Sequence, residues 1–224
     1  MKKYCISDIH GCRNTFAELL NKISFSQEDE LYLLGDYVDR GPDSKGVIDD
    51  IMKLQEEGYS VKCLMGNHEE KMLASSQSAV DTEEWLYWGG RETLISFAAK
   101  AANEIDAKYT DWLKNLDYYF EVDDFILVHA GLNFLIDDPM EDTHGMMWAR
   151  HYYQEINYQW LGERIIIHGH TPVDKDIILN QLQHLDKNRY LDIDNGCVYP
   201  KDGQAALCCF ELGEHKLTWQ KYCD

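Results

Sequence analysis

Short apolar runs alternate with amphipathic segments in the first third of the chain. Lys3 to Ser7, Leu31 to Leu34 and Ser60 to Met65 have the length and residue types of buried strands. Asn14 to Ile23 and Ser44 to Leu54 lie between them and repeat apolar residues every three or four positions, which predicts helices. The alternation predicts successive β-α-β units, in which neighbouring strands run parallel.

The pattern then changes from helical to strand-like. From about Glu69 to Leu116 it is helical, and the expected packing anchors are Trp85, Trp88, Phe97 and Trp112. Seven strand-like runs follow: Tyr118 to Val122, Phe125 to Val128, Arg164 to Ile167, Ile177 to Leu179, Tyr190 to Ile193, Ala205 to Phe210 and Lys216 to Gln220. Turn pairs at Asp123-Asp124, Asp202-Gly203 and Gly213-Glu214 predict hairpins and a second, more antiparallel sheet.

Together these elements predict an α/β fold with two mixed sheets packed face to face, as a β-sandwich flanked by helices. No stretch has the composition of a linker, and 224 residues is a common length for one α/β domain. We therefore expect a single domain over residues 1–224.

Charged and polar motifs follow the predicted strands. Three of them are Asp8-Ile9-His10-Gly11, Gly35-Asp36-Tyr37-Val38-Asp39-Arg40-Gly41 and Gly66-Asn67-His68-Glu69. Two more are His129-Ala130-Gly131 and Gly169-His170-Thr171-Pro172. Because the carboxyl ends of parallel strands meet at one edge of a sheet, these motifs are expected to converge there.

Net charge and cysteine content exclude several classes of protein. The formal charge of −19 argues against nucleic-acid binding, and a site for phosphate would need bound divalent cations to reverse the local field. No run reaches the roughly 18 apolar residues of a membrane span, so we expect a cytoplasmic protein. Seven scattered cysteines without a Cys-x-x-Cys pair indicate reduced thiols.

The strand-end motifs supply a set of candidate metal ligands: Asp8, His10, Asp36, Asn67, His129 and His170. Carboxylate, imidazole and amide oxygen together suit Mn²⁺, Zn²⁺ or Fe better than Ca²⁺, which prefers oxygen ligands alone. A carboxylate can bridge two ions about 3.5–4 Å apart, and Asp36 is the natural bridge.

In their order and residue types, these five motifs resemble the motif series of the PPP-type metallophosphatases, within the calcineurin-like phosphoesterases. The short chain is most similar to the small bacterial and phage serine/threonine protein phosphatases. This resemblance implies the calcineurin-like fold and two divalent metal ions, most often Mn²⁺. It also implies that Asp8 and His10 bind one ion, that Asn67, His129 and His170 bind the other, and that Asp36 bridges them.

The resemblance further implies roles in catalysis. Asp39 and His68 would form an acid pair that protonates the leaving group, and Arg40 would hold a phosphate oxygen. Arg150, in Met146-Met147-Trp148-Ala149-Arg150, is the candidate second phosphate-binding arginine. The expected reaction is hydrolysis of phosphoserine or phosphothreonine in a phosphorylated protein or peptide by a metal-bridging hydroxide, with phosphotyrosine left open.

Two other functions are compatible with the sequence. The first is a dinucleoside polyphosphate hydrolase of the same superfamily, and the second is a catalytically silent metal-binding interaction domain. Singly, each motif residue also has a structural interpretation as a turn acid, a loop histidine or a surface ion-pair partner. The aromatic segment from Trp148 to Trp160 could line a substrate groove or simply pack in the interior.

Overall fold

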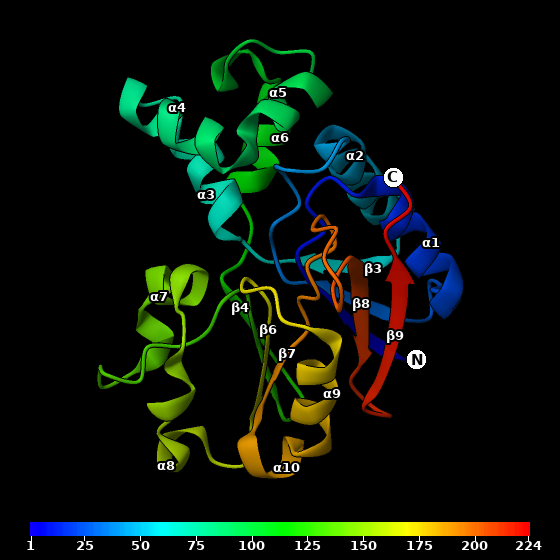
Figure 1. The fold of residues 1–224 in the computed structure, drawn as a ribbon, viewed down its shortest axis with the longest axis vertical. Coiled ribbons are helices and arrows are strands. Elements are labelled where there is room, and N and C mark those ends of the chain that lie inside the picture. Colours follow the sequence, from blue (N-terminus) through cyan, green and yellow to red (C-terminus); the bar gives the residue numbers. More distant parts are fainter.

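A computed structural model describes residues 1–224 and contains two β-sheets (Figure 1). The first has the strand order β3-β2-β1-β8-β9, from the strands β1 Lys3–Ile6, β2 Glu30–Leu33, β3 Ser60–Cys63, β8 Ala206–Glu211 and β9 Lys216–Lys221. The second has the order β4-β5-β6-β7, from β4 Tyr119–Val122, β5 Phe125–Val128, β6 Ile165–His168 and β7 Tyr190–Asp192.

Helices lie on the outer faces of the two sheets, and a further group of helices from the middle of the sequence lies at the top of the view (Figure 1). The α-helices are α1 Arg13–Ile23, α2 Ser44–Glu56, α3 Asn67–Ala74, α4 Ala79–Trp85, α5 Arg91–Ser96, α6 Ala107–Lys114, α7 Thr143–Trp148, α8 Tyr158–Leu161, α9 Lys175–Gln183 and α10 Leu185–Asn188. One short π-helix is η1 Leu86–Gly90, and three short 3-10 helices are η2 Ala102–Glu104, η3 Pro139–Glu141 and η4 Tyr152–Gln154. None of the helices combines the length and the low polarity needed to cross a lipid bilayer.

The alternation of side chains along the strands separates the interior into layers. In β1, Cys5 faces the second sheet and packs in a core with Phe125, Ile167 and Phe210. Its neighbour Ile6 faces the opposite way, into a larger core beneath α1 and α2. A third core lies between the outer face of the second sheet and the α7–α8 region. The predicted β-sandwich flanked by helices is therefore confirmed.

Strand register brings the site loops to the same level. Ile6 pairs with Leu33 and Leu33 pairs with Cys63, so the three parallel strands of the first sheet end side by side. In the second sheet, β5, β6 and β7 are also parallel, and Leu127 pairs with Ile167. The loops that follow β1, β2, β3, β5 and β6 consequently leave the sheets at one edge.

Three sequence predictions about the second half of the chain were wrong. Ile177 to Leu179 lies in helix α9, because Ile178 and Leu182 face the core at helical spacing and a three-residue apolar run does not distinguish helix from strand. Asp202-Gly203 does not form a hairpin, since β7 and β8 belong to different sheets. The antiparallel strands β8 and β9 join the first sheet, so the second sheet is mostly parallel.

Candidate metal centre

Five loops place the candidate ligands around the Asp36 carboxylate. Asp8 and His10 follow β1, Asp36 follows β2, Asn67 and His68 begin α3, and His129 and His170 follow β5 and β6. All of these side chains are buried. Asp8, His10, Asp36 and His170 have positive backbone φ angles between 45° and 74°, which turn the chain sharply enough to direct their side chains inward.

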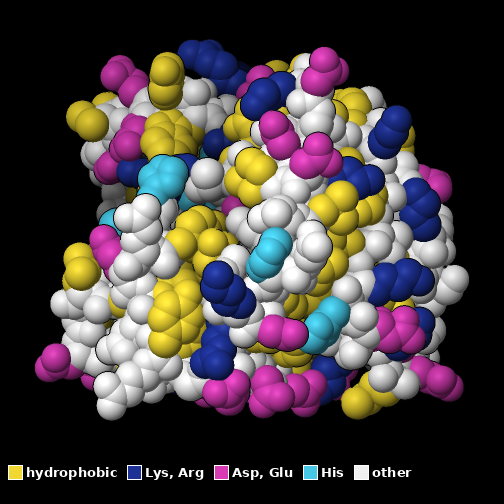
Figure 2. Space-filling model, turned by 60° about the horizontal axis from the view of Figure 1, so that its bottom comes forward, with side chains coloured by type: hydrophobic (Ala, Val, Ile, Leu, Met, Phe, Trp, Pro, Cys, Tyr) yellow, Lys and Arg dark blue, Asp and Glu magenta, His cyan; other side chains and the backbone are white.

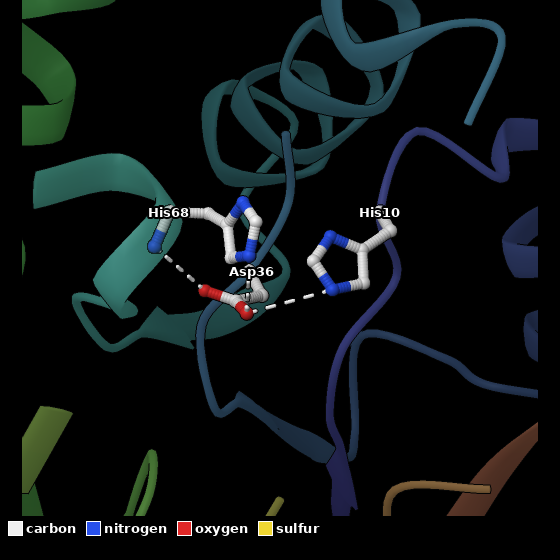
Figure 3. A group of neighbouring side chains, drawn as sticks. All are labelled: His10, Asp36 and His68. Carbon is white, nitrogen blue, oxygen red and sulfur yellow. Dashed lines mark hydrogen bonds and ion pairs between the residues drawn. The ribbon is translucent and has the colours of Figure 1, made fainter. Parts of the chain in front are cut away.

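The first cluster consists of His10, Asp36 and His68, whose candidate ligand atoms lie within 4.8 Å of one another. His10 Nε2 lies 3.5 Å from Asp36 Oδ2, and His68 Nε2 lies 4.0 Å from the same oxygen. Figure 3 shows both imidazoles with a ring nitrogen directed toward the carboxylate. Asp8 is outside this cluster, and its Oδ2 accepts hydrogen bonds from Ser7 Oγ and from the backbone N–H of His170.

The second cluster consists of Asp36, His129 and His170, so Asp36 is shared. His129 Nε2 lies 3.5 Å from Asp36 Oδ1, 2.9 Å from Asn67 Oδ1 and 3.2 Å from His170 Nδ1. His170 Nδ1 lies 2.8 Å from the same Asn67 oxygen. The resemblance assigned Asp36, Asn67, His129 and His170 to one ion, and the structure brings these four side chains together.

The protonation states of these groups favour a cation. His129 Nδ1 must donate its proton to the carbonyl oxygen of Leu34, because a carbonyl only accepts; the distance is 2.8 Å. This leaves a lone pair on Nε2, which faces the acceptor Asn67 Oδ1. His10 is held in the same way by the carbonyl of Val38 at 2.8 Å. The lone pairs of His129 Nε2 and Asn67 Oδ1 therefore face one another without a proton between them, which fits a pair of metal ligands.

Burial and the neighbouring charges shape the pKa values of the site. Desolvation lowers the pKa of His10, His129 and His170, and therefore keeps their imidazoles neutral, as metal binding requires. Burial, together with the nearby carboxylates Glu69 and Asp8, raises the pKa of Asp36 well above its ordinary value. Two further atoms, Asp8 Oδ1 and His170 Nε2, are buried without a hydrogen-bond partner. The residues present thus fit a pair of divalent cations.

Asp39 and His68 form the contact that the sequence predicted. His68 Nδ1 lies 2.7 Å from Asp39 Oδ2. Burial lowers the pKa of His68 and raises that of Asp39 to about 7, because desolvation penalises the charge on each partner. The hydrogen bond opposes this penalty, because an ionised Asp39 accepts a hydrogen bond from Nδ1–H. The other ring nitrogen, Nε2, is then directed at the site.

Two residues that sequence reasoning did not connect with the site hold Asp39 in place. Trp85 Nε1 donates to both carboxylate oxygens, at 3.0 and 3.1 Å, and Thr93 Oγ1 donates to Oδ1 at 2.7 Å. Thr93 Oγ1 also accepts the backbone N–H of Asp39 at 2.8 Å. Trp85, expected only as a packing anchor, therefore also orients Asp39 against His68.

Glu69 is a third residue without a predicted role. Its buried carboxylate accepts the backbone N–H groups of Asp36, Tyr37, Val38 and Gly66, at distances of 2.8–3.2 Å. It ties the loop after β2 to the start of α3 and so fixes Asp36 relative to Asn67. The signal available in the sequence was its position three residues after Gly66, where a helix-capping Glu is common.

The two candidate phosphate-binding arginines lie at the site but make different contacts. Arg40 Nη1 donates to His10 Nε2 at 2.6 Å, so a metal at His10 would require this bond to open. Arg150 is exposed and its Nη1 donates to Thr171 Oγ1 at 2.9 Å, next to His170. On the face of the molecule in Figure 2, acidic side chains gather along the lower edge while Lys and Arg are dispersed.

The aromatic segment from Trp148 to Trp160 divides between packing and the site. Tyr152 is buried in the third core, and Trp160 packs against that core. Trp148 lies at the site, with its ring centroid 6.3 Å from that of His170. His168 is buried behind the centre, where its Nε2 lies 3.1 Å from the hydroxyl of Tyr153, and it stays off the metal clusters.

Comparisons with known proteins agree with this geometry. The family model described as calcineurin-like phosphoesterase matches residues 1–207. A protein of Nitrosomonas europaea, named symmetrical bis(5'-nucleosyl)-tetraphosphatase, is 32% identical over 59% of this chain and 45% of its own length. A protein of the same name from Vibrio parahaemolyticus is 29% identical over 85% of this chain and 65% of its own. The chain thus spans about half to two thirds of the length of these curated relatives.

Solved structures share the fold at low sequence identity. A chain provisionally described as a diadenosine tetraphosphatase has a TM-score of 0.67 and 20% identity, with 100% of this chain and 95% of that chain covered. A protein serine/threonine phosphatase of Saccharomyces cerevisiae has a TM-score of 0.68 and 12% identity, covering 100% and 81%. At these identities the two structures support the fold alone.

The predicted activity on phosphorylated proteins is contradicted by the curated relatives. They are consistently named for a nucleotide tetraphosphatase, a different hydrolase from a serine/threonine protein phosphatase, and that name points to small-molecule substrates rather than a phosphoprotein. The physical reason for the error is that the motif residues were assigned only to metal ions and the phosphoryl group, which both substrate classes share. They carry no information about the rest of the substrate.

Proposed function

Because the chain belongs to the calcineurin-like phosphoesterase family, we propose that it hydrolyses dinucleoside polyphosphates such as bis(5'-nucleosyl) tetraphosphates. The observation that carries this proposal is the name shared by the curated relatives across the matched region. The geometry supports it, because two metal-capable clusters share Asp36 and two arginines lie beside them. The substrate is strongly anionic, so a chain of net charge −19 needs these local positive groups.

We propose that Asp36 is shared by two divalent cations, with Asp8 and His10 on one side and Asn67, His129 and His170 on the other. Mn²⁺ is the proposed ion, since carboxylate, imidazole and amide oxygen together suit it and no thiolate is present among these ligands. When bound, such ions neutralise phosphoryl charge and make a water molecule a better nucleophile at neutral pH.

His68 is proposed to act as an imidazolium that gives its Nε2 proton to the leaving group, while an ionised Asp39 accepts the hydrogen bond from Nδ1 and favours the charged ring. The leaving group of symmetrical cleavage is a nucleoside diphosphate, whose terminal phosphate has a pKa of about 6. It is a far weaker base than the alkoxide of a serine ester, so this chemistry depends less on a proton donor. His68 therefore contributes less to tetraphosphate hydrolysis than it would to hydrolysis of an alkyl monoester.

Arg40 and Arg150 are proposed to hold the polyphosphate chain. Their planar guanidinium groups can each donate two parallel hydrogen bonds to phosphate oxygens. A metal held by His10 would require Arg40 to leave its bond to that imidazole, and the guanidinium would then be free for the substrate. Arg150 is exposed at the edge of the centre and can contact a phosphate that extends beyond the metals.

The test is an assay of the Mn²⁺-loaded protein with diadenosine tetraphosphate, a phosphoserine peptide and p-nitrophenyl phosphate. Ion-exchange chromatography should show two molecules of ADP from each tetraphosphate; ATP plus AMP would indicate asymmetrical cleavage. Asp36→Asn serves as the control for contaminating phosphatases. Turnover of the phosphopeptide with no turnover of the tetraphosphate would refute the proposal.

A further inference from the structure

Two of the six tryptophans stand apart from the hydrophobic cores. Trp85 and Trp112 belong to or pack against the first core, Trp219 packs against the second and Trp160 against the third. Trp88 and Trp148 are in none of them and are only partly buried. Large apolar side chains that contribute to no core and lie in a functional site indicate binding surface rather than packing.

Trp88 lies against the acid pair. Its ring centroid is 5.8 Å from that of His68. The chain bends just after it at Gly89, whose φ of +111° favours glycine, and the Gly89 carbonyl accepts the backbone N–H of Arg40 at 3.1 Å. A Cβ at Gly89 would lie 2.8 Å from Arg40 Cγ, so glycine is also needed for this close approach. Trp88 is thereby fixed to the loop that carries Asp39 and Arg40.

Trp148 lies against the second metal cluster and is held from its polar edge. Its indole N–H donates to Glu70 Oε2 at 2.7 Å, and Lys71 Nζ is 5.4 Å from its ring centroid. Its centroid is 5.4 Å from that of Trp88 at an interplanar angle of 72°, so the two indoles meet as a corner. The exposed imidazole of His144 stacks on Trp148, with 16° between the planes, and extends this aromatic surface outward.

From this arrangement we propose that Trp88 and Trp148 form the stacking surface for a nucleobase of the substrate. The proposal rests on the proposed function and names the part of the site that recognises the base. A planar base can stack on one indole while its edge meets the other, which is a favourable geometry for aromatic rings. Stacking requires no positive charge, so it adds affinity for a nucleotide in a strongly acidic protein.

The experiment compares two inhibitors that differ only in the base. AMP and ribose 5-phosphate each compete with p-nitrophenyl phosphate on the Mn²⁺-loaded protein, and the ratio of their inhibition constants isolates the contribution of adenine. In the wild-type protein AMP should bind more tightly by roughly 5- to 100-fold, the range expected for one base on an aromatic platform. AMP should also quench tryptophan fluorescence, whereas ribose 5-phosphate should not.

Trp88→Ala and Trp148→Ala should each move the inhibitor ratio toward one while the inhibition constant of ribose 5-phosphate stays within about twofold. Phenylalanine at either position should restore part of the ratio and also provides a variant that keeps the packing volume close. Tyr87→Ala is the matched control, because Tyr87 is an aromatic neighbour on the same turn with 89% of its surface exposed. It should leave the ratio unchanged.

The inference is overturned by a wild-type ratio near one, or by a ratio that survives both alanine substitutions. It is equally overturned if both inhibitors weaken together, since that result indicates a distorted phosphate site. Failure of the proposed function is a separate result, in which the protein does not turn over the tetraphosphate. If AMP still binds much more tightly than ribose 5-phosphate, the stacking surface is supported and only the proposed substrate is wrong.

Discussion

Replacing Thr93 with valine is expected to destabilise the fold by about 2–4 kcal/mol. The buried hydroxyl donates to Asp39 Oδ1 at 2.7 Å and accepts the Asp39 backbone N–H at 2.8 Å. Losing a hydrogen bond to a carboxylate costs about 1.5–3 kcal/mol, and the weakened N–H contact adds roughly 0.5–1 kcal/mol. The addition stays small because Ser44 Oγ also accepts this N–H, at 3.1 Å.

Urea unfolding, followed by circular dichroism at pH 8 with EDTA, measures this difference without a contribution from bound metal. At that pH Asp39, whose pKa is raised to about 7 mainly by burial, is ionised. Thr93→Ser keeps the hydroxyl and should lose only about 1 kcal/mol for the missing methyl group. Thr110→Val, at a solvent-exposed hydroxyl on helix α6, should stay within about 0.5 kcal/mol.

Two results would refute this reasoning. The first is a loss below about 0.5 kcal/mol for Thr93→Val, which would show that the hydroxyl does not support a buried carboxylate. The second is a larger loss for Thr93→Ser than for Thr93→Val. That order would mean that the methyl group, through packing, contributes more than the hydrogen bonds.

Three further predictions concern the site and helix α7. His68→Asn should retain two metals per chain by elemental analysis while lowering kcat for an alkyl phosphate monoester by about 10²–10⁴-fold, with a smaller loss for the tetraphosphate; loss of metal would make His68 a ligand. Arg150→Ala should raise the inhibition constant of inorganic phosphate, and an unchanged constant would remove Arg150 from the phosphate site. Asp142→Ala should cost about 1 kcal/mol at neutral pH, because Asp142 caps α7. A hydrogen bond from the backbone N–H of Gly145, and after it one from the Asn133 side chain, lowers the pKa of Asp142 below its ordinary value of 3.8. The contribution of Asp142 to stability is therefore present above pH 3.8 and is lost as the pH falls through the lowered pKa. A difference in unfolding free energy between variant and wild type that is the same in urea at pH 6 and at pH 3 would contradict this.

The sequence predicted the part of the fold in which local pattern and topology act together. Apolar runs at β1, β2 and β3 are short and flanked by helices, so parallel pairing brought Asp8, Asp36 and Asn67 to one edge. Ile177 to Leu179 gave no such context, because three apolar residues fit a strand and a helix face equally well.

The supporting contacts of the site could not be predicted in this way. Trp85 and Thr93 reach Asp39 across 46 and 54 positions of sequence, and no local spacing connects them. The same holds for Trp88 and Trp148, which meet from separate helices. The substrate was beyond prediction for a further reason, since every role assigned to the motif residues concerns the metal ions or the phosphoryl group and none concerns the rest of the substrate.

The positive φ angles at the site have a consequence for engineering and for evolutionary drift. Asp8, His10, Asp36, Asp39, Arg40 and His170 all adopt this backbone conformation. A residue other than glycine costs on the order of 1–3 kcal/mol there, less for Asp and His than for Arg. A screen for thermostability alone should therefore recover glycine or asparagine most readily at Arg40, and that gain would remove a group proposed to bind phosphate. Consensus or library designs for this chain should hold these six positions fixed.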